Sequence, residues 1–139
     1  DQRVNEAPPA GAPGAPAPAA PAPGAPASTT VARGSFRSLA HKTSGTATIV
    51  TLPDGVSYVR LEDFETENGP DLFVYLSPSD GRGDDDAIAR NSINLGRLRG
   101  NIGDQNYRIP AGTDLSGYKS VLIWCKRFTT GFGVASLRQ

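Results

Sequence analysis

Residues 46–64, TATIVTLPDGVSYVRLEDF, are the stretch from which the fold is first predicted. β-Branched and other apolar residues recur on both sides of Pro53-Asp54-Gly55, and this tripeptide is a strong turn signal. After the turn, Val59 and Leu61 fall on one face of an extended chain and Arg60 falls on the other. Two such runs joined by a tight turn predict an antiparallel β-hairpin.

Short runs of the same kind continue along the chain and predict an all-β domain. They lie at residues 72–76, 94–98, 107–109, 120–125 and 131–137, with turn signals about every 8–12 residues. The run 72–76 is apolar on both faces, which is typical of a strand covered on both sides. The Asp-rich stretch 84–90 predicts one helical turn. Over residues 33–139 we therefore expect an antiparallel β-sandwich or partly closed barrel of about seven to nine strands.

The N-terminal part of the chain has a different composition. Every residue from Ala7 to Ala27 is Ala, Pro or Gly, and 8 of the 12 prolines lie there. Such a segment buries little apolar area, so residues 1–32 are expected to be a disordered stalk or linker with few contacts to the domain. If it is a lipoprotein spacer, a signal peptide ending in a cysteine precedes Asp1; an inert linker is the alternative.

The charge balance and the side-chain inventory exclude several classes of function. The 139 residues carry 14 basic and 14 acidic side chains, so nucleic acid is not expected as a partner. His41 is the only histidine, Cys125 is the only cysteine and methionine is absent, so no metal site is predicted and no internal disulfide can form. No run of about 18 apolar residues occurs, so no membrane-spanning segment is predicted.

Enzymatic activity is not indicated by any motif, and we expect a non-enzymatic monomer. No Gly-x-Ser-x-Gly motif surrounds a serine. Strand alternation places Glu62 and Asp63 on opposite faces, which argues against a catalytic carboxylate pair.

Cys125 is the candidate functional residue, and two interpretations of it stay open. It lies near the end of the run 121–128, VLIWCKRF, where Val121, Ile123 and Cys125 share one face. A lone cysteine is most often a small buried apolar residue. Positive charge at Lys126 and Arg127 would instead favour a thiolate and hence a nucleophile or metal ligand.

Several blocks of the sequence together resemble the DM13 domain family, the electron-transfer DM domain. The blocks are HKTSGTA (41–47), LEDFET with NGPDL (61–72), LGRL with GNIGDQNY (95–107), and IWC (123–125) followed by Phe128 and Phe132-Gly133. They occur in the family's order, and the resemblance covers about residues 33–138.

The resemblance implies a β-sandwich-like domain of secreted or membrane-tethered proteins with a redox role. The family's characteristic cysteine lies in the Trp-Cys block, which here is Trp124-Cys125. Cys125 is thus implied as a redox thiol or, with Trp124, as the holder of a haem-like group. The implied setting is extracytoplasmic, secreted or lipid-anchored at a bacterial envelope, with a redox or envelope protein as partner. The alternative is a non-catalytic binding or adhesion module in which Cys125 is structural.

Overall fold

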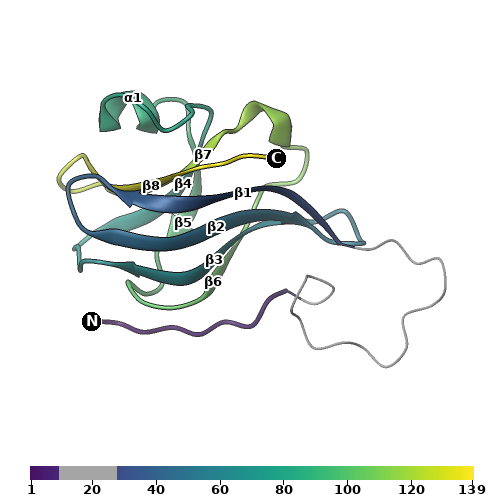
Figure 1. Ribbon diagram of the computed structural model, residues 1–139, viewed down its shortest axis with the longest axis horizontal. Helices are drawn as coiled ribbons and strands as arrows, with labels where there is room; N and C mark the ends of the chain where they lie inside the picture. The colour runs from purple at the N-terminus through teal and green to yellow at the C-terminus, as the bar shows by residue number, and fades with distance from the viewer. Residues whose placement is uncertain (10–27) are drawn as a thin grey trace.

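The computed structural model describes residues 1–9 and 28–139 and shows one eight-stranded antiparallel sheet curled into a nearly closed barrel (Figure 1). The order across the sheet is β5-β4-β7-β8-β1-β2-β3-β6. The all-β prediction is confirmed. The elements are β1 (Thr29–Ser38), β2 (Thr43–Thr51), β3 (Ser57–Thr66), β4 (Leu72–Ser77), α1 (Asp85–Ala89), β5 (Ile93–Arg97), β6 (Gln105–Arg108), a 3₁₀ turn (Leu115–Gly117), β7 (Ser120–Cys125) and β8 (Thr130–Ser136).

The predicted hairpin is present as β2 and β3. Thr51 pairs with Ser57 across the turn, and Gly55 takes a φ of 89° that the turn requires. At its far end a bulge interrupts the alternation, because Asp63 adopts a φ of 51° opposite Gly45. Glu62 and Asp63 are consequently both exposed, so the expectation that they lie on opposite faces is wrong.

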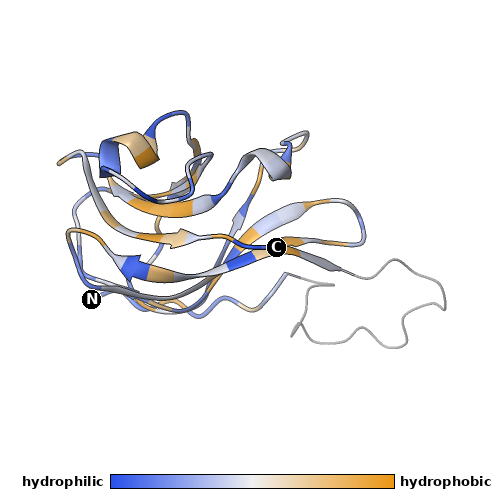
Figure 2. Cartoon of the chain, turned by 45° about the horizontal axis from the view of Figure 1, so that its top comes forward, coloured by the Kyte–Doolittle hydropathy of each residue, from blue (hydrophilic) through white to orange (hydrophobic). Residues whose placement is uncertain are grey.

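Apolar side chains form two cores on the two sides of β4, β7 and β8. The barrel interior holds the larger core, to which Val74 and Ile123 contribute. On the outer side, Ile88 of α1 packs against Leu122 and Trp124, so the short helix closes a second, smaller core. Figure 2 shows hydrophobic residues along these strands and on α1. Strand β4 is thus covered on both faces as predicted, on one side by a helix.

The expected tail of residues 1–32 differs from the structure at both of its ends. Strand β1 already begins at Thr29, and residues 1–6 lie along the loop between β5 and β6, where Arg3 bridges to Ile102 (Figure 1). Docking of residues 1–9 rests on backbone hydrogen bonds and polar side chains, which an argument from apolar area does not detect. The predicted disorder of residues 10–27 falls outside the described residues. Within the described residues, no helix has the length and apolar character needed to cross a membrane.

Candidate functional site

Cys125 is the last residue of β7, and its side chain points into the barrel interior. Its exposed fraction is 0%, and it belongs to the same apolar cluster as Phe36, Phe64 and Phe132. The predicted burial of this thiol among aromatic residues is confirmed. In the folded conformation the sulfur is therefore out of reach of a reagent or partner in solution.

Trp124 lies on the opposite face of β7. It packs in the outer core with Leu122, and its ring stacks on that of Tyr75 at a centroid distance of 6.2 Å. Burial, with the nearby Asp71 carboxylate, raises the pKa of the Tyr75 phenol. The predicted alternation along β7 is confirmed, and it means that Trp124 and Cys125 do not converge on one site.

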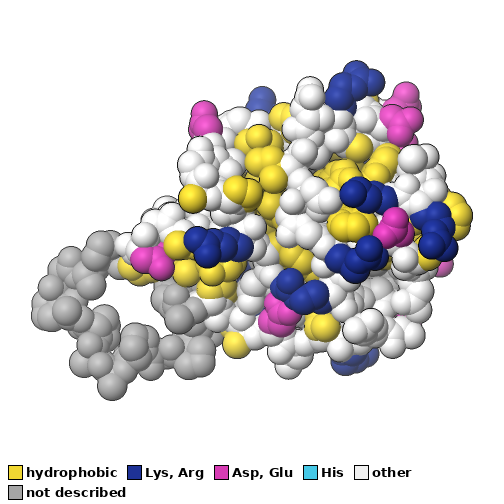
Figure 3. Space-filling view, turned by 180° about the vertical axis from the view of Figure 1, so that it is seen from behind, with side chains coloured by type: hydrophobic (Ala, Val, Ile, Leu, Met, Phe, Trp, Pro, Cys, Tyr) yellow, Lys and Arg dark blue, Asp and Glu magenta, His cyan; other side chains and the backbone are white. Residues whose placement is uncertain are grey.

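Lys126, one of the two cations that follow Cys125 in the sequence, faces an aromatic ring on β4, which it shares with Arg97 of β5. The Lys126 ammonium lies 4.7 Å and the Arg97 guanidinium 4.8 Å from the centre of the Phe73 ring. Arg97 also pairs with the Asp71 carboxylate at 3.0 Å. Of the two cations predicted to act on the thiol, Lys126 thus faces the Phe73 ring, and Arg127 is exposed. Figure 3 shows the back of the molecule, where Lys and Arg side chains gather around hydrophobic surface.

The turn after Cys125 is exposed and conformationally strained. Phe128 has an exposed fraction of 60%, and the β-branched Thr129 adopts a φ of 46°. Cys125 pairs with Thr130 at the closed end of the β7–β8 hairpin. On its other side Cys125 pairs with Leu72 of β4, so the residue lies in a central strand, next to an exposed turn.

The surroundings of Cys125 do not fit a haem. Five hollows on the described surface have volumes of about 150 to 450 Å³, and Cys125 and Trp124 line none of them. A haem held through this thiol needs an open apolar slot beside the sulfur, where the structure has packed core. Among residues 1–9 and 28–139, no three His, Cys, Asp or Glu side chains are grouped to hold a metal ion.

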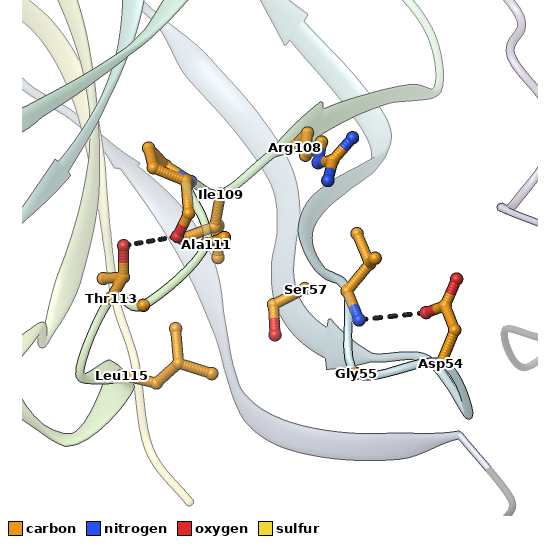
Figure 4. A pocket seen from close by; sticks show the side chains of 11 residues that line it. Asp54, Gly55, Ser57, Arg108, Ile109, Ala111, Thr113 and Leu115 are labelled. Atoms are coloured by element: carbon orange, nitrogen blue, oxygen red, sulfur yellow. Dashed lines mark hydrogen bonds between the residues drawn. The ribbon is translucent and has the colours of Figure 1, made fainter.

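The hollow between the β2–β3 turn and the segment after β6 has a volume of about 250 Å³ (Figure 4). Polar groups on its wall already have partners. The Asp54 carboxylate accepts a hydrogen bond from the Val56 N–H at 2.9 Å, and the Thr113 hydroxyl donates to the Pro110 carbonyl at 2.7 Å. This hollow therefore offers few free groups for recognition.

A polar cluster that the sequence did not single out lies around β6. Gln105 is fully buried and accepts a hydrogen bond from the Tyr107 hydroxyl, which in turn accepts one from the Arg99 N–H at 3.0 Å. Burial raises the pKa of Tyr107 to about 12. The sequence carries no separate signal for this cluster, because the neighbouring block 100–104, GNIGD, is explained by turn chemistry.

Comparison with known proteins gives one match. The model of a family described as electron transfer DM13 matches residues 35–137. The matched region runs from β1 to the residue after β8 and includes Trp124 and Cys125. Comparisons with curated proteins and with solved structures give no match.

Proposed function

Since the chain belongs to the DM13 family of electron-transfer domains, we propose that it is an extracytoplasmic redox accessory domain in which Cys125 is the group oxidised and reduced. The observation that carries the proposal is the position of the sulfur. Cys125 is the only cysteine of the chain and ends β7 directly before an exposed, strained turn. In the proposed cycle the end of β7 detaches from Thr130 of β8 and from Leu72 of β4, and this local opening exposes the thiol while the rest of the barrel stays folded.

A single thiol completes a redox cycle only with a second molecule. In the proposed reaction the opened Cys125 thiolate attacks a disulfide of a partner protein or small molecule, after losing its proton to solvent. A new sulfur–sulfur bond to Cys125 forms, the partner's bond breaks, and the leaving sulfur takes up a proton. Cys125 is oxidised and the leaving sulfur is reduced; a second thiol reverses the reaction.

The extracytoplasmic location and the tether are part of the proposal. They rest on the family resemblance and on the Ala, Pro and Gly composition of residues 7–27, which suits a spacer between an anchor and a domain. The partner is accordingly a redox or envelope protein that meets the domain outside the cytoplasm. Detection of the precursor in the membrane fraction, with a lipid on a cysteine upstream of Asp1, tests the lipid-anchored form.

The redox role is tested by the rate at which iodoacetamide alkylates Cys125 in the folded protein. We expect slow alkylation whose rate rises only weakly with urea below the unfolding transition, as for a local opening. Thr129→Gly relieves the positive φ and stabilises the turn, so alkylation is expected to slow about fivefold.

The matched control is Asn91→Gly, which also places glycine at a positive φ, here 61°, in a turn far along the chain from the hairpin. It is expected to leave the alkylation rate nearly unchanged. A urea dependence of the alkylation rate equal to that of global unfolding would show that only the unfolded chain exposes the thiol.

That outcome would favour the second candidate, a non-catalytic binding or adhesion module. The 0% exposure of Cys125 is the observation that supports it, because a thiol so packed contributes to the core whether or not it reacts. In that case Cys125→Ala changes stability alone.

A further inference from the structure

Residues 1–7, DQRVNEA, form an extended strand on the loop between β5 and β6 (Figure 1). Three backbone hydrogen bonds connect them to this loop. The Ile102 N–H donates to the Gln2 carbonyl at 3.3 Å and the Val4 N–H to the Ile102 carbonyl at 2.9 Å. The Glu6 N–H donates to the Asp104 carbonyl at 2.9 Å, so every second residue of the segment takes part, as in a parallel β-ladder.

Side chains of the domain recognise both ends of this strand. The Asp1 carboxylate accepts hydrogen bonds from the side-chain amides of Asn68 at 3.0 Å and Asn101 at 3.1 Å. The Glu6 carboxylate accepts two from the Arg99 guanidinium, at 2.6 and 2.8 Å. Two acidic side chains five residues apart are therefore bound by separate polar groups of the domain. One of these groups is the Arg99 guanidinium, which forms two hydrogen bonds with the same carboxylate.

Two glycines allow the strand to approach the loop closely. A Cβ atom on Gly103, whose φ is 111°, would lie 1.7 Å from the Val4 carbonyl oxygen. A Cβ atom on Gly100 would lie 2.7 Å from the Gln2 carbonyl oxygen and 3.0 Å from a Val4 methyl group. The loop is thus shaped for a peptide backbone with a branched apolar side chain between the two acids.

Arg60 of β3 connects the strand to the barrel. It is only 6% exposed, and its Nη1 donates to the Glu6 carbonyl at 2.7 Å and to the Asn106 side chain at 3.0 Å. The Asn106 side chain in turn donates to the Ala7 carbonyl at 2.7 Å. If the strand leaves, the Arg60 guanidinium and the Asn106 amide each lose a hydrogen-bond partner. Binding of another strand at this edge would restore both hydrogen bonds.

The strand itself is held mainly by polar contacts. Of residues 1–7, only Val4 and Glu6 are partly buried, and the others are exposed. Pro9 and Thr30, the latter in β1, line one hollow. The family match begins at residue 35, outside this strand. The segment therefore has the features of a tethered ligand on a domain with its own core.

We propose that the edge formed by Arg60 and residues 99–106 is a peptide-binding site for an extended segment of the pattern Asp-x-x-Val-x-Glu. Residues 1–7 occupy it in cis, and an acidic strand of a protein partner with this pattern displaces them. Backbone pairing supplies general affinity for a strand, and the two acids and the valine supply selectivity.

The test uses the full-length chain and the fluorescently labelled synthetic peptide DQRVNEA. Val4→Pro with Glu6→Ala removes the donated ladder bond and the carboxylate of the cis strand, both at partly exposed positions. We call this double variant the unlocked chain. It is expected to bind the peptide at least about tenfold more tightly than the natural chain, in which residues 1–7 fill the site. The single variant Glu6→Ala keeps the backbone ladder. Its affinity for the peptide is expected to lie between those of the natural and the unlocked chain.

Matched peptides and a charge reversal assign the binding to this edge. A peptide with lysine in place of the glutamate is expected to bind the unlocked chain about tenfold more weakly or worse. Adding Arg99→Glu to the unlocked chain is expected to reverse that preference. No binding to any folded unlocked variant, equal binding to the natural chain, or an unchanged preference after Arg99→Glu would each overturn the proposal.

Discussion

Replacing Cys125 by serine tests how the barrel uses its only thiol. The side chain is fully buried among apolar residues at the end of β7. Serine is slightly smaller, and its hydroxyl needs a hydrogen-bond partner that an apolar cluster does not supply. Burying an unpaired hydroxyl costs about 1–3 kcal/mol, and lost packing around the sulfur adds to this. We therefore expect Cys125→Ser to lower the free energy of unfolding by about 2–4 kcal/mol.

Cys125→Ala is the control, because it removes the sulfur without adding a polar group. Its expected cost is about 1–2 kcal/mol. Urea unfolding followed by tryptophan fluorescence measures both variants, and Trp124, the only tryptophan, lies next to the mutated position. A Cys125→Ser variant at least as stable as Cys125→Ala would refute the reasoning. It would show that the hydroxyl finds a hydrogen-bond partner or a water molecule at this end of the hairpin.

Three further predictions concern other parts of the fold. Hydrogen bonds from Arg99 lower the pKa of Glu6. The carboxylate therefore stabilises the docked strand fully above its ordinary pKa of 4.5, and this stabilisation is lost as the pH falls through the lowered pKa. NMR titration of the docked strand measures this loss, and Glu6→Gln should abolish the transition. Tyr107→Phe leaves the buried Gln105 carbonyl without its donor and is expected to cost about 1–3 kcal/mol in urea unfolding. Ile88→Ala removes the fully buried anchor of α1 and is expected to cost about 2–5 kcal/mol by the same measurement.

Strand positions with strong alternation were predictable from sequence. The hairpin of β2 and β3 follows from two alternating runs and a Pro-Asp-Gly turn, and both are short-range signals. Strand β1, TTVARGSFRS, escaped the prediction because its only buried apolar residues are Ala32 and Phe36, four positions apart. Its place between β2 and β8 depends on pairing with segments up to about a hundred residues away.

For Cys125 and Trp124, the strand face was predictable from the sequence and the surroundings were not. Alternation along β7 correctly placed Trp124 and Cys125 on opposite faces. It carried no information on the contact of the Lys126 ammonium, because Phe73, whose ring Lys126 faces, comes from another strand. The bulge at Asp63 likewise depends on Gly45 across the sheet.

By itself, the sequence determined the class of fold, the turn positions, the family and the single thiol, because periodicity, turn chemistry and residue counts are local properties of the chain. Only the tertiary structure decided that Cys125 is fully buried and that residues 1–7 lie against residues 99–106, in the loop before β6 and the start of that strand. Both outcomes come from contacts between distant segments. The close approach of Val4 to Gly103 and the reach of Arg60 to Glu6 exist only once the barrel has brought these residues together.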